Sequence, residues 1–403
     1  MSQPLPPASP LSPPASVAPA LKGMALLRLG FRPFYLLSAL LACVSVPLWI
    51  GVFIGHVPWD LELPALYWHA HEMLFGFAAG VIAGFLLTAV RAWTGRDTAR
   101  GPLLGTLALL WLAARVAFFV APYPVFAALD VVLLPAVAVI LLRVLIQAGN
   151  KRNLPLIGIL LLMSAANLVF HLSAMGAITV PVMASLYAEL ALILMVISVM
   201  TGRVVPMFTK NVTPGLVITI PRKFDLTLLA VTAVALALWV VSAPAMLTLV
   251  ACLLAAALHA VRLYQWHPQV TLTRPILWVL HLSYLWMPLG FVLLAMAQLG
   301  WVSDSIAVHA FAVGVIGGLI IGMITRTARG HTGRPLKASK GEAIAYALVL
   351  IAAVLRTIVP AIEPQYYLRC LEVAAALWAV GFAIYLVIYT PWLTRTRLDG
   401  KDG

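Results

Sequence analysis

The sequence is poor in charged residues, which make up only 10% of its 403 positions. Soluble globular proteins carry about 25% charged residues. In contrast, 63% of this chain is hydrophobic, more than a single core surrounded by water can bury. The composition excludes a soluble enzyme or binding domain, and we expect the lipid bilayer to surround most of the surface.

Cysteine is equally scarce. Cys43, Cys252 and Cys370 each lie alone inside an apolar segment. This excludes a disulfide framework, a CxxC metal pair and a CxxCH site for covalent haem. The sequence also lacks a phosphate-binding loop and a dinucleotide fingerprint. Chemistry that depends on a nucleotide is therefore not indicated.

Acidic residues are half as frequent as basic ones, 13 against 26, which gives a net charge of +13. In a soluble protein this excess would suggest a nucleic-acid partner. Here, 23 of the 26 Lys and Arg residues fall in alternate connections between apolar segments or at the two ends. By the positive-inside rule, the face that carries them is cytoplasmic. We expect both termini in the cytoplasm and no nucleic acid.

Apolar segments of roughly 18 to 25 residues are long enough to cross about 30 Å of hydrocarbon. They occur near 33–54, 67–90, 102–120, 124–147, 155–174, 183–202, 225–242, 244–264, 275–299, 304–325, 341–360 and 367–390. The predicted fold is therefore an all-α membrane protein with about twelve transmembrane helices.

The predicted transmembrane domain covers residues 23–392. Residues 1–22 are rich in proline, and we expect a disordered cytoplasmic tail there. Residues 393–403 are expected to form a short cytoplasmic tail at the C-terminus.

Two predicted spans are related in sequence. Residues 71–96 and 309–334 align without gaps and share nine identities in 26 positions. The identities include one histidine, three glycines spaced by four residues, and a terminal Thr-Gly-Arg. Thr201-Gly202-Arg203 resembles a further copy after the sixth span. We interpret the second and tenth spans as copies of one segment. That the chain consists of three four-helix pseudo-repeats is a hypothesis.

The repeat pairs His71 with His309 at similar depth on two parallel helices. Two such imidazoles can supply both axial nitrogens of one non-covalent b-type haem. The alternative is that each histidine is a hydrogen-bonded packing residue. The repeat favours the haem. Arg115 and Arg356 would then bind the haem carboxylates, or they would pair with buried acids such as Asp130 and Glu189.

The repeated glycines form one stripe on each helix, and each stripe faces away from its histidine. Gly76, Gly80 and Gly84 make the first stripe, and Gly314, Gly318 and Gly322 make the second. We predict that both stripes allow close packing of helices.

His69 lies two residues before His71, so on a regular helix the two rings point about 200° apart. Glu72 should fall on the side of His69. If His71 holds haem, His69 and Glu72 face another partner, for which copper is a candidate because imidazole suits copper. His171 follows Asn167 on a polar stripe, which either completes a metal site or satisfies backbone groups.

A second group of polar residues is expected near the cytoplasmic side of the membrane. It comprises His259, Arg262, His281 and Tyr284, bordered by His331. A second cofactor or a proton route could be built from these residues, but solvated or loop-bound roles explain them equally well.

Four stretches resemble the NnrS family of bacterial membrane proteins. They are GFRPFY at 30–35, HAHEMLFG at 69–76, GRVVPMFT at 202–209 and GHTGRPL at 330–336. The resemblance implies a polytopic inner-membrane protein that contains haem and copper and acts in the response to nitric oxide. It also implies nitric oxide or a related molecule as partner, with an electron donor still to be identified.

A looser similarity links the chain to haem–copper oxidases, which place haem ligands on spans 2 and 10 of twelve helices. The sixth span lacks histidine, however, so oxygen reduction by their mechanism is not indicated. The main rival hypothesis is a secondary transporter whose buried Asp, Glu and His residues relay protons. An assembly factor without a cofactor is the third.

Overall fold

The computed structural model describes residues 23–402, and within them every regular element is helical. Twelve segments are long and apolar enough to cross a membrane, which confirms the predicted fold class. The proposed tail at 1–22 lies outside the described residues. The spans are α1 (Phe31–Phe53); α2 (Ala65–His71), η2 (Glu72–Ala78) and α3 (Ala79–Thr94); α4 (Gly101–Val120); α5 (Tyr123–Asp130) and α6 (Leu133–Gln147); η3 (Lys151–Asn153) and α7 (Leu154–Ala174); α8 (Val182–Lys210); α9 (Arg222–Val240); α10 (Ala245–Gln265); α11 (Pro275–Gln298); α12 (Asp304–His309), η5 (Ala310–Gly317) and α13 (Gly318–His331); α14 (Lys340–Ile362); and η6 (Pro364–Tyr366) and α15 (Tyr367–Leu393).

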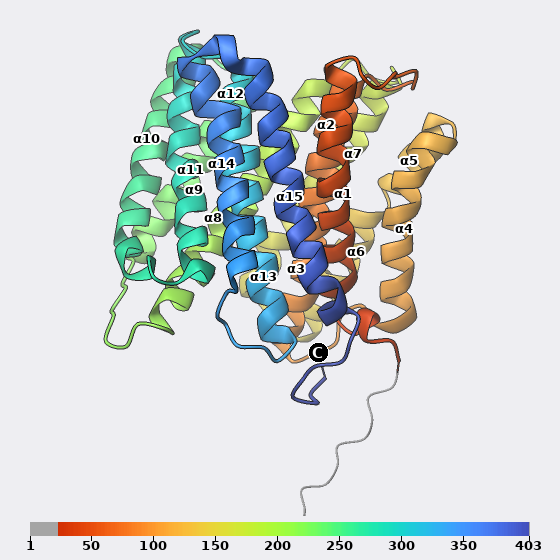
Figure 1. Ribbon diagram of the computed structural model, residues 1–403, viewed down its shortest axis with the longest axis vertical. Helices are drawn as coiled ribbons and strands as arrows, with labels where there is room; N and C mark the ends of the chain where they lie inside the picture. The colour runs from red at the N-terminus through yellow and green to blue at the C-terminus, as the bar shows by residue number, and fades with distance from the viewer. Residues whose placement is uncertain (1–22, 403) are drawn as a thin grey trace, which may run out of the picture.

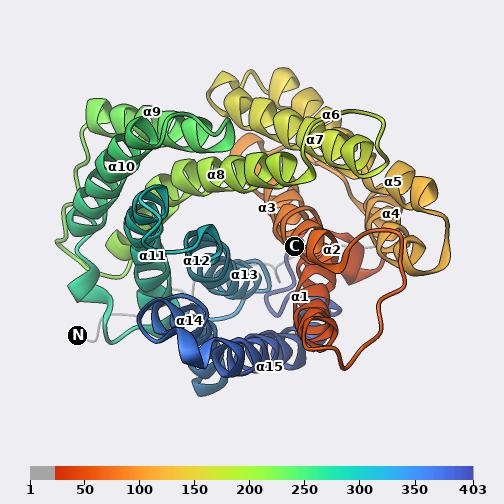
Figure 2. The same ribbon diagram turned by 90° about the horizontal axis from the view of Figure 1, so that it is seen from above.

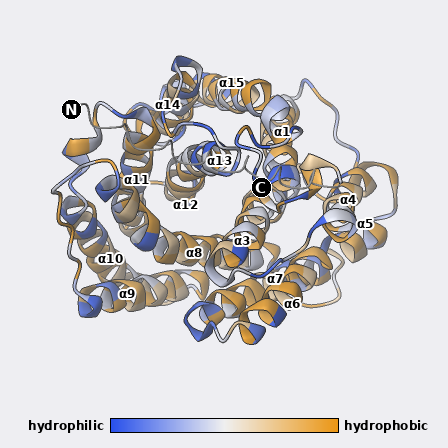
Figure 3. Ribbon diagram, turned by 90° about the horizontal axis from the view of Figure 1, so that it is seen from below, coloured by the Kyte–Doolittle hydropathy of each residue, from blue (hydrophilic) through white to orange (hydrophobic). Residues whose placement is uncertain are grey.

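The spans run up and down through the molecule, and both ends of the described chain lie at the same end of it (Figure 1). Seen from above, α13 occupies an interior position with α8, α11, α14 and α15 around it (Figure 2). The first span packs against the last, α1 against α15. Hydrophobic residues cover the outward sides of the helices, and hydrophilic residues gather at helix ends (Figure 3).

Polar contacts join the two ends of the chain at this face. The Nη1 atom of Arg32, on α1, donates to the carbonyl oxygens of Leu393 at 2.7 Å and Arg395 at 2.8 Å. Asp402 pairs with Arg91 at 2.8 Å and with Arg100 at 2.7 Å. The C-terminal segment is therefore held against the membrane domain.

The two related spans share an unusual backbone feature. Each begins with a short α-helix that ends at the repeated histidine, α2 at His71 and α12 at His309. Each continues directly as a π-helix, η2 (Glu72–Ala78) and η5 (Ala310–Gly317). π-Turns are rare and are frequently found at functional sites. Their matched positions support descent of both spans from one segment.

The glycine stripes allow close helix packing, as the sequence predicts. A Cβ atom at Gly80 would lie 2.6 Å from Oγ of Ser38 on α1, and one at Gly318 would lie 2.3 Å from Oγ of Ser283 on α11. Both glycines therefore face a serine on the preceding span.

Thr201-Gly202-Arg203 does not form a third copy of the repeated ending. In the first two copies the glycine turns the chain with positive φ, 68° at Gly95 and 73° at Gly333. Gly202 instead lies inside α8, which continues to Lys210. Its role there is spatial, because a Cβ atom would lie 1.6 Å from Nη2 of Arg262. The hypothesis of three pseudo-repeats gains no support from this segment.

Candidate functional site

The two histidines of the HAHEMLFG segment face different surroundings, as their spacing predicts. The ring of His69 stacks on Trp49, with centroids 5.0 Å apart and planes 11° apart. It lines a cavity of about 340 Å³. His71 is fully buried, does not line that cavity, and joins a separate polar network. The segment therefore contributes to two sites.

The cavity is largely apolar. Its charged or ionisable lining consists of His69 on α2, Tyr187 on α8, His309 on α12 and Arg356 on α14. The remaining lining residues are mostly aliphatic and aromatic and come from α1, α8, η5 and α15 as well. A concave apolar space with a few converging polar groups is the usual form of a cofactor or ligand site.

Each of His69, His309 and Arg356 has a nitrogen atom without a hydrogen-bond partner in the described structure. The Nδ1 atom of His309 lies 2.7 Å from the carbonyl oxygen of Ser305, so this nitrogen carries the proton and Nε2 remains a free electron-pair donor. The Nδ1 atom of His69 is buried without a hydrogen-bond partner in the described structure. Arg356 donates to Oγ of Ser305 at 3.1 Å through Nη2, while its buried Nη1 has no such partner there. Buried polar atoms without partners call for an explanation, which a bound ligand would supply.

This arrangement changes the predicted ligand pair. The sequence pairs His71 with His309, whereas the structure places His69 with His309 on one cavity. Both histidines end the short helix before their π-helix, as expected of a repeat, but equivalence in the repeat could not predict which side chains surround each ring. His71 contacts Asp130 on α5 and Asn167 on α7. In the second copy, the described hydrogen bonds of His309 reach only Ser305, on its own helix.

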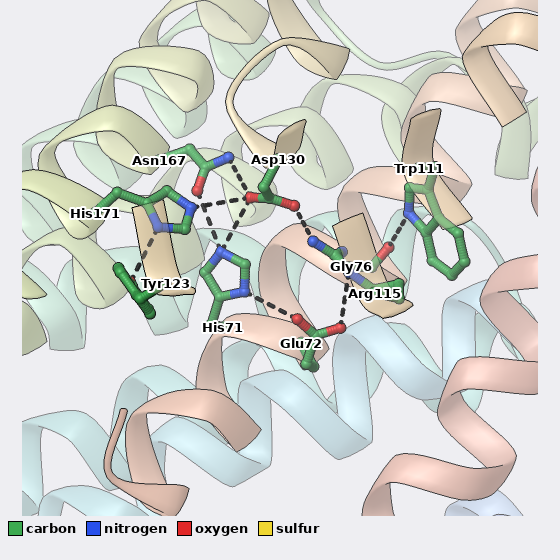
Figure 4. A network of polar contacts seen from close by, with 9 residues as sticks. All are labelled: His71, Glu72, Gly76, Trp111, Arg115, Tyr123, Asp130, Asn167 and His171. Atoms are coloured by element: carbon green, nitrogen blue, oxygen red, sulfur yellow. Dashed lines mark hydrogen bonds and ion pairs between the residues drawn. The ribbon is translucent and has the colours of Figure 1, made fainter. Parts of the chain in front are cut away.

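His71 belongs to a buried chain of charges (Figure 4). Its Nδ1 atom lies 3.1 Å from Oε1 of Glu72, and its Nε2 atom lies 3.2 Å from Oδ2 of Asp130. Arg115 on α4 joins both acids, with Nε 3.1 Å from Oε2 of Glu72 and Nη2 in contact with Oδ1 of Asp130. Arg115 is therefore an ion-pair partner, the second of its predicted roles. The prediction that Glu72 lies on the side of His69 is wrong, because its carboxylate pairs with His71 and Arg115.

His171 completes the network from α7. Its Nε2 atom lies 3.2 Å from Oδ2 of Asp130, and its Nδ1 atom lies 3.0 Å from the hydroxyl of Tyr123 (Figure 4). Asn167 donates to the same Oδ2 atom at 2.7 Å. One ligand atom from each of His71, Asp130 and His171 falls within 4.8 Å of the others. The polar stripe of His171 and Asn167 was visible in the sequence, but nothing marked Tyr123.

The π-helix η2 shapes this network. Trp111 on α4 donates from Nε1 to the carbonyl oxygen of Gly76 at 3.1 Å. A Cβ atom at Gly76 would lie 2.9 Å from Nη1 of Arg115 and 3.0 Å from Oε2 of Glu72. The glycine therefore leaves room for the guanidinium, and the widened turn offers its carbonyl to a neighbouring helix.

The predicted cytoplasmic-side group is only partly assembled. His259 lies 2.6 Å from the hydroxyl of Tyr284 through Nδ1 and 3.0 Å from Oγ1 of Thr232 through Nε2. Arg262 donates to the carbonyl oxygen of Ser198 at 2.9 Å and pairs with Asp225 at 3.1 Å. Both ring nitrogens of His259 are therefore engaged, whereas the buried Nε atom of Arg262 has no hydrogen-bond partner in the described structure.

Two members of that predicted group have other hydrogen-bond or ring partners. His281 contacts the carbonyl oxygen of Leu277 at 3.0 Å and Oγ1 of Thr209 at 3.4 Å. His331 packs against the ring of Phe31, with centroids 5.5 Å apart. His331 is the last residue of α13 and lies beside α1. It therefore does not join Tyr284, although the sequence predicts both on the same side of the membrane.

The family model described as "NnrS protein" matches residues 25–397. A comparison with curated proteins finds no match.

Proposed function

The chain belongs to the NnrS family, and from this premise we propose that it binds b-type haem and acts in the response to nitric oxide at the bacterial inner membrane. The observation that carries the proposal is the apolar cavity with His69 and His309 on its wall. Two imidazoles are a common ligand pair for haem iron. Bound there, haem would supply one-electron redox chemistry.

The residues of the cavity fit this cofactor. Ser305 fixes the tautomer of His309 through its carbonyl oxygen, 2.7 Å from Nδ1; metal-ligating histidines usually have such a partner on their second nitrogen. Trp49 fixes the plane of the His69 ring by stacking. Arg356 has a buried Nη1 atom without a hydrogen-bond partner in the described structure, and this atom would bind a haem carboxylate. The aliphatic and aromatic walls suit the apolar faces of a haem.

Nitric oxide handling requires more than a haem with two histidine ligands. With both imidazoles as ligands, His69 and His309 would hold a haem suited to electron transfer with an external donor. Binding of nitric oxide would need one histidine to leave. Of the two, His69 lacks a hydrogen bond at Nδ1 in the described structure, whereas His309 is anchored by Ser305. We propose His69 as the ligand that is displaced.

Absorption spectroscopy of the purified protein tests the proposal. We expect a Soret band and, after reduction, the α and β bands of a six-coordinate haem. His69→Ala and His309→Ala should each lower haem content at least tenfold, because each removes a ligand. His267→Ala is the control, since this histidine lies between α10 and the next short helix in a turn and should leave the haem content unchanged.

His71→Ala separates the structure-based ligand pair from the one predicted from sequence. If haem is lost from His71→Ala but kept in His69→Ala, the assignment of His69 is wrong. A correctly folded, colourless wild-type protein would contradict haem binding altogether.

One observation favours the rival transporter function. Glu189 on α8 is completely buried, and both of its carboxylate oxygens lack a hydrogen-bond partner in the described structure. Arg356, its predicted partner, contacts Ser305 instead. A buried acid of this kind suits a proton relay. A colourless protein that carries protons into proteoliposomes, and loses this proton uptake in Glu189→Gln, would favour this function.

A further inference from the structure

We propose that His71, Asp130 and His171 bind one first-row transition-metal ion at a site separate from the cavity of His69 and His309. The proposal goes beyond the haem function and does not require it. All three side chains are buried, with exposed fractions of 0%, 7% and 1%. They come from three different spans, α2, α5 and α7, so only the folded chain brings them together.

The ligand atoms converge on one point. The Nε2 atoms of His71 and His171 each lie 3.2 Å from the same carboxylate oxygen, Oδ2 of Asp130. Oδ1 of Asn167 also lies 3.2 Å from Nε2 of His71. Figure 4 shows the two rings and the carboxylate turned toward one another. Two imidazoles and one carboxylate form a common ligand set for iron, zinc and copper.

The second nitrogen of each ring is held by another residue. Glu72 holds Nδ1 of His71 at 3.1 Å, and the hydroxyl of Tyr123 lies 3.0 Å from Nδ1 of His171. Metal-ligating histidines nearly always have such outer partners, which fix the tautomer and raise the basicity of the ligand nitrogen. Here both histidines have one, and both leave Nε2 directed at Asp130.

The hydrogen-bond pattern leaves a place for a cation. When Nδ1 of neutral His71 donates its proton to Glu72, Nε2 has only a lone pair. That lone pair then faces Oδ2 of Asp130 and Oδ1 of Asn167, which are both acceptors. Three electron-rich atoms so close together repel one another unless a proton or a metal ion lies between them.

The charges also call for a cation. Glu72 and Asp130 carry two negative charges, and Arg115 supplies one positive charge through its contacts with both. One negative charge therefore remains in a buried site, where an uncompensated charge is costly. A proton on His71 would balance it, with Nε2–H of His171 donating to Asp130. A metal cation held between the two Nε2 atoms and Oδ2 would offset the same charge and use both rings as ligands, and metal loading distinguishes the two states.

Metal loading of the intact purified protein tests the site. Samples incubated with Zn²⁺, Cu²⁺ or Co²⁺ are desalted, and bound metal is measured by mass spectrometry, with haem iron counted separately as the pyridine haemochrome. We expect about one non-haem metal per wild-type chain, and its loss in His171→Gln and Asp130→Asn. In the Cu²⁺ form, electron paramagnetic resonance should show coupling to two nitrogen nuclei.

His281→Gln is the matched control, because His281 is a buried histidine of another span whose nitrogens contact Leu277 and Thr209. It should bind as much metal as wild type. If His171→Gln fails to fold, Tyr123→Phe keeps the ligands and removes only the outer partner, and we expect about tenfold weaker binding.

Haem content should be unchanged in Tyr123→Phe, so failure of this site and failure of the haem site are distinguishable. Wild-type protein that retains no metal would overturn the proposal and leave a proton on His71. Equal retention by wild type, His171→Gln and Asp130→Asn would also overturn it.

Discussion

Two histidines that lie two positions apart at the end of α2 have different surroundings. His69 contacts Trp49 and the cavity, whereas His71, two positions later, contacts Glu72, Asp130 and Asn167. The sequence predicted that the rings diverge, because 200° of rotation follows from helical geometry. It could not predict which ring faces which site, because that depends on how α2 is rotated against spans distant in sequence.

The glycine stripes give a prediction at the scale of one residue. A Cβ atom at Gly314 would lie 2.3 Å from Cγ of the Trp286 ring, and a bulky ring cannot move aside as a flexible chain end can. We expect Gly314→Ala to lower the stability of the protein by about 1–3 kcal/mol. Thermal unfolding in detergent measures the effect.

Gly158→Ala is the matched control. Gly158 also lies within a helix, α7, but a Cβ atom there meets nothing within 4 Å. Its replacement should leave the unfolding temperature unchanged or raise it, since alanine favours helix over glycine. Equal destabilisation by both substitutions would show that the contact with Trp286 is unimportant.

At the scale of the element, the π-helices η2 and η5 are the feature that sequence reasoning missed. Hydrophobicity predicted twelve spans because a span needs only length and apolar composition. A π-turn changes neither property, so it leaves no signal in a hydropathy profile. The repeat did indicate that the segments after His71 and His309 are related, and in the structure both segments form a π-helix.

Deletion of one residue tests what the widened turn does. A single π-turn accommodates about one residue more than an α-turn, so deletion of Met73 within η2 should convert it to α-helix while both flanks keep their packing. Deletion of Val81 in α3 (Ala79–Thr94) should instead rotate the following turns by about 100°. We expect the first variant to remain monodisperse in size-exclusion chromatography and the second to aggregate. The opposite result would contradict this role of η2.

At the scale of the whole molecule, the alternation of basic connections and the even number of spans agree with both described ends lying at one face (Figure 1). The helix count followed directly from composition. The two sites did not, because each is assembled from spans far apart in the chain: α2, α12 and α14 for the cavity, and α2, α4, α5 and α7 for the network. The residue pattern within one span cannot predict which residues of other spans it contacts.

Reporter fusions test the predicted orientation. Green fluorescent protein fused after Thr394 should fluoresce, because the positive-inside rule places this end in the cytoplasm. Alkaline phosphatase fused at Gly300, between α11 and α12, should be active, since that connection is expected on the opposite side. Exchange of the two results would reverse the topology.

The contact between α1 and α15 has a consequence for biosynthesis. The guanidinium of Arg32 binds the carbonyl oxygens of Leu393 and Arg395, which the ribosome adds near the very end of translation. The first helix to enter the bilayer must therefore wait for the last before it reaches its native neighbour. A chain cut short before Leu393 would lack both of these acceptors, so translation must be almost complete before this contact can form.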